Sequence, residues 1–307
     1  MKLSHRVLAL LLFLQACGGS GGSSGTAATP VSTNSETETT STEPTETSLY
    51  WGGGDSQFGV LHLPSDTSKP VSTVLMIHGG CWSSPFTYRL QTPLSQELAR
   101  RGYAVWNIEF RRLGNGGAWP TIFQDVAAAT DHLRQLVSDY EYKLDLDRVT
   151  AIGHSSGGHL ALWVTSSRRL GLESPLYRPN PMFIRGVIPI APVVDLESPV
   201  CATSVADLIG RDGLGDNSLA TRLAETSPID MLPSGVASIV ISGENDTVAP
   251  PPITQSYVDA ALNAGDIIEH IVLNEADHFD VIDPEFLDMN LVTDAIEQVQ
   301  ARTGLPR

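Results

Sequence analysis

The chain is poor in positive charge. Its 307 residues include 19 lysines and arginines against 35 aspartates and glutamates, so the formal net charge is -16 and the pI is near 4.7. An acidic surface repels phosphate backbones and anionic lipid headgroups. This balance argues against nucleic acid and against bare anionic membrane surfaces as partners.

The apolar run near the N-terminus is short. Residues 7–14 are apolar and follow the basic residues Lys2, His5 and Arg6. About 20 apolar residues are needed to span a bilayer, so this run excludes a membrane-spanning helix at this point. A basic start followed by a short apolar run is typical of a secretory signal peptide, which we place at residues 1–17.

Cysteine is also scarce, with only Cys17, Cys81 and Cys201. The sequence Leu-Gln-Ala-Cys at 14–17 resembles the bacterial lipobox, in which a small residue precedes a cysteine that receives a diacylglycerol thioether. This resemblance implies lipidation at Cys17 and an exported bacterial lipoprotein of the cell envelope, touching the membrane through its lipid anchor alone. By the same resemblance, Gly18 after the cysteine points to the outer membrane. The alternative is an ordinary secretory peptide with an incidental cysteine.

Residues 18–48 have no apolar periodicity. They are rich in glycine and serine, and then in threonine, serine and glutamate. Such a segment cannot bury enough surface to offset the entropy of the chain, so the sequence predicts a disordered linker. The folded domain is then expected at residues 49–307, long enough for one large α/β domain.

Within that domain, strand-like and helix-like stretches alternate. Apolar, β-branched runs predict strands at 57–64, 71–77, 103–110, 148–152, 185–194, 239–242 and 267–273. Helical spacing predicts helices at 86–101, 119–137, 252–264 and 284–302 and after the strand at 148–152. This alternation indicates an α/β fold with a mostly parallel sheet and helices on both faces. Residues 197–233 break the pattern and predict a short lid-like insertion.

The sequence Gly-His-Ser-Ser-Gly at 153–157 lies between the predicted strand and its following helix. A G-x-S-x-G sequence there is typical of a nucleophile elbow, in which a sharp turn projects one serine hydroxyl above the sheet. Ser155 is therefore the candidate nucleophile. The alternative is a glycine-rich turn with a solvated serine.

A serine nucleophile needs a histidine base and a carboxylate that orients the base. Asp246 follows the predicted strand at 239–242, and His278 follows the strand at 267–273. The order Ser155, Asp246, His278 is that of the α/β-hydrolases. Asp195 is the competing acid, because it follows the strand at 185–194.

The tetrahedral intermediate of such a reaction needs two amide donors. The sequence His-Gly-Gly-Cys-Trp at 78–82 follows a buried strand, and its glycines let backbone N–H groups turn toward a site. We expect the amides of Gly79, Gly80 and Cys81, together with that of Ser156, to form the oxyanion hole. His78 is expected to fix the loop.

With these motifs, residues 56–302 resemble the esterase and lipase branch of the α/β-hydrolases. The H-G-G-x-W and G-H-S-S-G motifs are similar to those of kynurenine formamidase-like enzymes and related carboxylesterases. The resemblance implies a serine hydrolase that cleaves small or short-acyl carboxylic esters through an acyl-enzyme, without metal or organic cofactor. Arylformamidase or exopeptidase-like activity is the alternative, and a non-catalytic surface binding lipoprotein is a remote one. Nothing in the sequence indicates an oligomeric state.

Cys81 and Cys201 both fall in the predicted domain. Because exported proteins meet oxidising conditions, these cysteines could form a disulfide between the oxyanion loop and the insertion. The alternative is two buried thiols.

Overall fold

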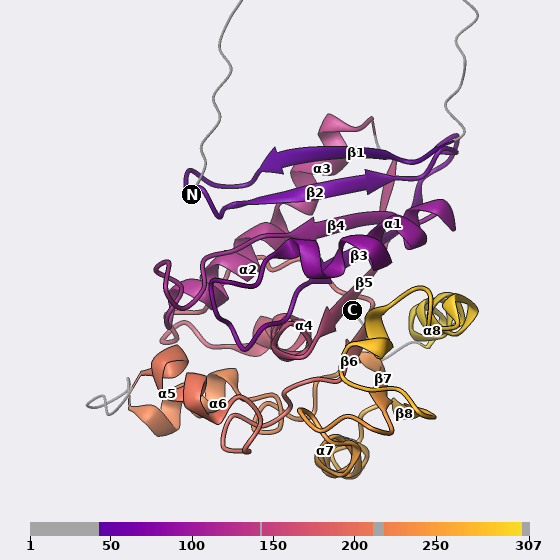
Figure 1. Cartoon of the computed structure of the whole chain (residues 1–307). Coiled ribbons are helices and arrows are strands. Elements are labelled where there is room, and N and C mark those ends of the chain that lie inside the picture. The colour runs from indigo at the N-terminus through magenta and orange to yellow at the C-terminus, as the bar shows by residue number, and fades with distance from the viewer. Residues whose placement is uncertain (1–42, 142, 211–217, 303–307) are drawn as a thin grey trace, which may run out of the picture. The chain divides into compact units, whose positions relative to one another are not determined.

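The computed structural model describes residues 43–141, 143–210 and 218–302 (Figure 1). The predicted signal peptide with Cys17, and residues 18–42 of the predicted linker, lie outside the described residues.

The centre of the domain is an eight-stranded sheet in the order β1-β2-β4-β3-β5-β6-β7-β8. The strands β1 and β2 pair antiparallel with their neighbours, and all other pairs are parallel. Their bounds are Thr45–Tyr50 (β1), Phe58–Leu63 (β2), Val71–Ile77 (β3), Ala104–Ile108 (β4), Leu144–His154 (β5), Gly186–Ile190 (β6), Ala237–Gly243 (β7) and Ile268–Leu273 (β8). The predicted α/β-hydrolase fold class is confirmed.

The domain begins earlier than the sequence predicted. Strand β1 starts at Thr45, inside the segment expected to be a linker, and pairs with β2 from Thr45↔Leu63 to Tyr50↔Phe58. The predicted boundary at residue 49 was therefore wrong. An edge strand buries little side-chain surface and is held mainly by backbone hydrogen bonds, so a polar composition concealed it. In the sheet, β2 therefore lies between β1 and β4.

Helices cover both faces of the sheet. On β4, the indole of Trp106 donates to the carbonyl of Ala129 in α2 (Thr121–Asp131), whereas the amide of Asn107 donates to the carbonyl of Tyr88. Consecutive strand residues point to opposite faces, so α2 and the segment starting at Tyr88 lie on opposite sides. That segment is the 3-10 helix Tyr88–Gln91, which leads into α1 (Thr92–Arg100).

Two helices differ from the prediction. The helix expected at 119–137 is divided into α2 and α3 (Leu133–Asp139) at His132. Trp106 uses the Ala129 carbonyl, and Thr130 Oγ1 donates to the Val126 carbonyl at 2.7 Å. Side chains that enter the helical hydrogen-bond ladder bend or break a helix. The helix expected at 86–101 starts at Thr92 in α1, where proline follows in the first turn.

The remaining helices are α4 (Ser156–Ser166), α5 (Ala202–Ile209), α6 (Leu219–Thr226), α7 (Pro251–Asn263) and α8 (Met289–Ala301). The expected helix at 284–302 thus begins five residues later, where the Asp288 side chain accepts from the Asn290 amide as its N-cap. The helices α5 and α6 lie in the described part of the insertion (Figure 1). No helix among the described residues combines the length and the apolar composition that crossing a membrane requires.

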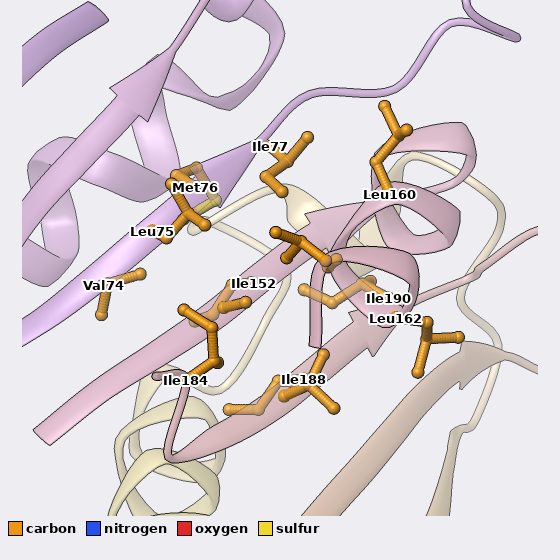
Figure 2. Packing of buried hydrophobic residues seen from close by; sticks show 14 of the residues in the cluster. Val74, Leu75, Met76, Ile77, Ile152, Leu160, Leu162, Ile184, Ile188 and Ile190 are labelled. Atoms are coloured by element: carbon orange, nitrogen blue, oxygen red, sulfur yellow. The ribbon is translucent and has the colours of Figure 1, made fainter. Parts of the chain in front are cut away.

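One part of the core lies where β3, β5 and β6 meet α4, the helix that follows the Ser155 turn. Side chains of these strands and of α4 pack together, as Figure 2 shows for Val74, Leu75, Met76, Ile77, Ile152, Leu160, Leu162, Ile188 and Ile190. Strands buried on both faces read as continuous apolar runs, as in this sequence. This packing fixes the carboxyl ends of the central strands, where ligand sites of parallel sheets lie.

Candidate active site

Ser155 occupies the turn between β5 and α4. Its φ and ψ are 55° and -121°, which a residue with a Cβ rarely adopts, and its amide donates to the Ile190 carbonyl at 2.8 Å. A Cβ on Gly157 would overlap the carbonyl oxygens of Ile77 and His78. The elbow therefore packs against the end of β3 only because residue 157 is glycine.

The predicted acid and base form a pair. Asp246 follows β7 and His278 follows β8, and His278 Nδ1 lies 2.7 Å from Asp246 Oδ2. The other carboxylate oxygen accepts from the amides of Val248 and Ala249, each at 2.8 Å. Since Nδ1 donates to the carboxylate, Nε2 of a neutral His278 is left free to accept a proton.

Asp246 is buried and stays ionised. Burial pushes its pKa upward, but the hydrogen bond from His278 and the amides of Ala249 and Val248 outweigh this effect, and the pKa lies below its ordinary value. A buried negative charge beside the histidine favours the imidazolium form that arises when His278 takes a proton.

The loop after β3 has an unusual backbone. Gly80, Cys81 and Trp82 have φ values of 110°, 48° and 57°. A Cβ on Gly80 would overlap the ring of Phe86. The Trp82 amide donates to Ser156 Oγ at 3.2 Å, which joins this loop to the start of α4.

His78 fixes the start of the same loop, as expected. Its Nδ1 donates to the Gly79 carbonyl at 2.9 Å, which leaves Nε2 to accept from Arg112 at 3.4 Å. Arg112 in turn pairs with the buried Glu109. Burial, together with the Arg112 charge, lowers the pKa of His78 to about 3, so it is neutral near pH 7.

A small cavity of about 110 Å³ brings the predicted residues together. Ser155, His278, Gly80 and Cys81 line it. Its other walls are apolar or aromatic and come from Phe86, Leu90, His154, Val248 and Phe279.

Two predicted oxyanion-hole residues, Gly79 and Ser156, are not among the residues that line this cavity. A Cβ on Gly79 would lie 3.0 Å from the Ser155 Cβ and 2.6 Å from the His154 carbonyl oxygen. Ser156 is the first residue of α4 and is buried. Both are therefore close to the candidate nucleophile.

His154 was not singled out from the sequence. Its Nε2 donates to the His278 carbonyl at 2.8 Å, and its ring lies 4.6 Å from the His278 ring. Burial, followed by the neighbouring His278, lowers its pKa to about 3. Its position directly before Ser155 is the sequence signal that could have found it.

Other carboxylates near the site shape loops. Asp195, the competing acid, accepts from the Glu197 amide at 2.8 Å and makes a turn after β6. Asp277 accepts from the amides of Phe279 and Asp280, and the Asp280 carboxylate accepts from the Asp277 amide. These hydrogen bonds give the loop around His278 its shape.

Cys81 and Cys201 form a disulfide with a Cα–Cα distance of 5.5 Å. It joins the loop after β3 to the residue that precedes α5. As for metals, the described residues contain no group of three or more histidine, cysteine, aspartate or glutamate side chains placed to hold an ion.

The sheet order, the serine turn after β5 and the acid–histidine pair after β7 and β8 define an α/β-hydrolase. The comparison with known families narrows this class. The chain belongs to the BD-FAE family, whose model matches residues 60–259.

Individual relatives agree with this class. A kynurenine formamidase of Danio rerio is 24% identical over 235 residues, which cover 75% of this chain and 73% of the relative. A truncated carbohydrate esterase from gut microbiota has a TM-score of 0.69 at 20% identity, covering 85% of this chain and 98% of that one. Esterase B of Lactobacillus rhamnosis, inhibited by a tributyrin phosphonate, also has a TM-score of 0.69 at 20% identity, covering 84% and 86%. These two structures share the fold.

Proposed function

We propose that this protein is a serine hydrolase that cleaves small or short-acyl carboxylic esters, with Ser155 as nucleophile, His278 as base and Asp246 as the orienting acid. The observation that carries the proposal is the 2.7 Å contact between His278 and Asp246 at a cavity that His278 and Ser155 line together. The esterase names of the structural relatives support the same reaction class.

In the first half-reaction, Ser155 Oγ attacks the carbonyl carbon of the ester and its proton passes to His278 Nε2. Asp246 stabilises the resulting imidazolium through Nδ1. The carbonyl oxygen becomes an oxyanion that accepts hydrogen bonds from backbone amides of Gly80 or Cys81 and of Ser156. The intermediate then expels the alcohol, which takes the proton from His278, and an acyl group remains on Ser155.

In the second half-reaction, a water molecule replaces the alcohol. It loses a proton to His278 as its oxygen attacks the acyl carbon, and the same amides hold the second oxyanion. Collapse of this intermediate releases the carboxylic acid and returns the proton to Ser155. The cycle requires no redox step.

The cavity volume supports a short acyl group. A wholly apolar cavity of ~150 Å³ holds one benzene molecule. The cavity at Ser155 measures about 110 Å³ and has apolar walls at Phe86, Leu90, Val248 and Phe279. An acyl group of a few carbons fits this space, whereas a long fatty acyl chain exceeds it.

An N-formyl amide hydrolase is the second candidate, and the similarity to kynurenine formamidase favours it. A formyl group is smaller than an acetyl group and would also fit the cavity. Both reactions use the same acyl-enzyme route, so the leaving group decides between them.

A substrate panel tests the proposal. Purified protein is assayed on p-nitrophenyl acetate, butyrate and octanoate and on N-formylkynurenine, with Ser155→Ala as the control. We expect kcat/KM to fall from acetate to octanoate and Ser155→Ala to abolish hydrolysis. Hydrolysis that persists in Ser155→Ala would contradict the assignment, and turnover of N-formylkynurenine well above the esters would favour the formamidase.

We further propose that the protein is exported and lipidated at Cys17, which the lipobox-like sequence at 14–17 supports. Two or more acyl chains on this cysteine would give a durable membrane anchor. Metabolic labelling with palmitate in a bacterial host should label the wild type and not Cys17→Ala. Equal absence of label in both would exclude lipidation.

A further inference from the structure

The loop that contains the candidate oxyanion-hole amides has to be held by contacts from outside. Gly80, Cys81 and Trp82 are consecutive residues with positive φ. Cysteine and tryptophan carry a Cβ, for which this region of backbone space is unfavourable. Because these φ values set where the Cys81 amide points, any group that holds the loop also sets the oxyanion hole.

Two separate contacts connect this loop to the insertion at 197–233. The first is the disulfide from Cys81 to Cys201, which directly precedes α5 and itself has a φ of 55°. The second starts at the Trp82 indole, whose Nε1 donates to His159 Nδ1 at 3.3 Å. His159 Nε2 then donates to the carbonyl of Thr226, the last residue of α6, at 2.9 Å.

The protonation of His159 is consistent with this chain of contacts. Burial lowers its pKa to about 4, so the ring is neutral and carries one proton near pH 7. A carbonyl only accepts and an indole N–H only donates. The proton must therefore be on Nε2, and Nδ1 accepts from Trp82.

The described part of the insertion contacts the loop and not the catalytic cavity. The residues that line the cavity lie at 80–90, 154–155, 248 and 278–279, so none comes from 197–210 or 218–233. Its disulfide instead reaches Cys81, which lines that cavity. This arrangement differs from a lid that covers the substrate.

We propose that Cys201 is a positioning residue for catalysis: its disulfide with Cys81 holds the oxyanion loop in the conformation that directs the Cys81 amide at the developing oxyanion. The inference rests on the proposed function, because it assigns the disulfide a role in stabilising the tetrahedral intermediate. It predicts an effect on the transition state that is separate from any effect on folding.

The test compares Cys201→Ala with wild type on p-nitrophenyl acetate, and also measures inhibition by a small aliphatic trifluoromethyl ketone. Ser155 adds to this ketone and its carbonyl oxygen becomes an oxyanion, so the inhibition constant reports on the oxyanion hole. Removing a whole donor typically lowers kcat 100-fold to 1,000-fold, so a misdirected donor should lower it about ten-fold. We expect the inhibition constant to rise by a similar factor while KM changes less than about two-fold.

Val205→Ala is the matched control, because it removes buried volume from α5 and leaves the disulfide intact. It should lower the melting temperature without changing kcat. Dithiothreitol supplies a second comparison: it transfers two electrons to the disulfide, leaves two thiols and becomes a cyclic disulfide itself. Both cysteines are partly exposed, so treatment should lower the kcat of wild type and leave that of Cys201→Ala unchanged.

The outcomes separate the two proposals. If wild type hydrolyses the ester and Ser155→Ala does not, the proposed function stands. An unchanged kcat in Cys201→Ala would then overturn the positioning role. The role would also be overturned if the loss of activity equalled the fraction of unfolded protein and the ketone inhibited the folded fraction as strongly as it inhibits wild type. A wild type without activity would overturn the proposed function and this inference with it.

Discussion

The imidazole of His154 donates from Nε2 to the backbone carbonyl of His278 at 2.8 Å, which joins the residue before the candidate nucleophile to the candidate base. Its other nitrogen, Nδ1, is buried and has no hydrogen-bond partner among the described residues. The contact crosses 124 residues of sequence and ends on the loop after β8. It therefore fixes the position of the His278 backbone relative to the turn that contains Ser155.

Replacing His154 should impair catalysis through His278. In His154→Leu the donor is lost, and a small displacement of a catalytic group can lower the rate by about ten-fold to 100-fold. His154→Gln places an amide N–H near the position of Nε2, so it should restore most of kcat. Steady-state kinetics on p-nitrophenyl acetate check this, and equal kcat values for the Leu and Gln variants would argue against the contact as the cause.

Asp246→Asn should lower kcat by a factor on the order of 10⁴, because an amide that donates to Nδ1 leaves His278 in the wrong tautomer. The matched control is Asp195→Asn, which alters the competing acid after β6, whose carboxylate accepts from the Glu197 amide. It should keep its activity. If Asp195→Asn lost activity and Asp246→Asn retained it, Asp195 and not Asp246 would be the acid that orients His278.

The free energy of unfolding should fall as the pH falls from about 6.5 to 4. Burial lowers the pKa values of His78, His154 and His159 from 6.5 to about 3, 3 and 4, so the unfolded chain binds protons in this range and the folded chain does not. Stability that rises with pH in this range has the expected sign. Each pKa unit between the unfolded and the folded value of a histidine contributes ~1.4 kcal/mol to this change in the free energy of unfolding.

Denaturant unfolding at pH 4.5, 5.5, 6.5 and 7.5 measures this slope. His159→Gln, which keeps polar atoms but does not titrate, should flatten it. The depressed pKa of Asp246 adds a loss only at lower pH, as the pH falls through its folded value. A stability that is constant between pH 4.5 and 6.5 would contradict the prediction.

Gly157→Ala should destabilise the domain by about 1–3 kcal/mol, because the added Cβ overlaps the carbonyl oxygens of Ile77 and His78. Gly53→Ala is the control, since a Cβ at that position meets no atom within 4 Å. Thermal unfolding of both variants measures the difference. Equal melting temperatures would mean that the elbow can move away from β3.

Family resemblance and the fold class were predictable from the sequence, because they depend on local patterns. Buried parallel strands appear as apolar runs, such as that at 71–77, and helices appear as regular spacing. The motif at 153–157 was recognisable because a sharp turn between a strand and a helix requires small residues. The candidates Asp246 and His278 follow from chain order in the same fold.

Tertiary contacts decided where one helix is interrupted and where the sheet begins, which local sequence patterns do not encode. The interruption of the helix at His132 involves Trp106, which belongs to β4 and whose indole donates to the Ala129 carbonyl. Strand β1 is held by its pairing with β2 at the edge of the sheet.

The sequence by itself determined the α/β class and the set of chemically capable residues, since both follow from composition and spacing along the chain. Only the tertiary structure decided that His154 contacts the His278 loop and that Cys81 is bonded to Cys201 in the insertion. These partners lie 124 and 120 residues apart, and contacts at such separation depend on how the strands are ordered in the sheet.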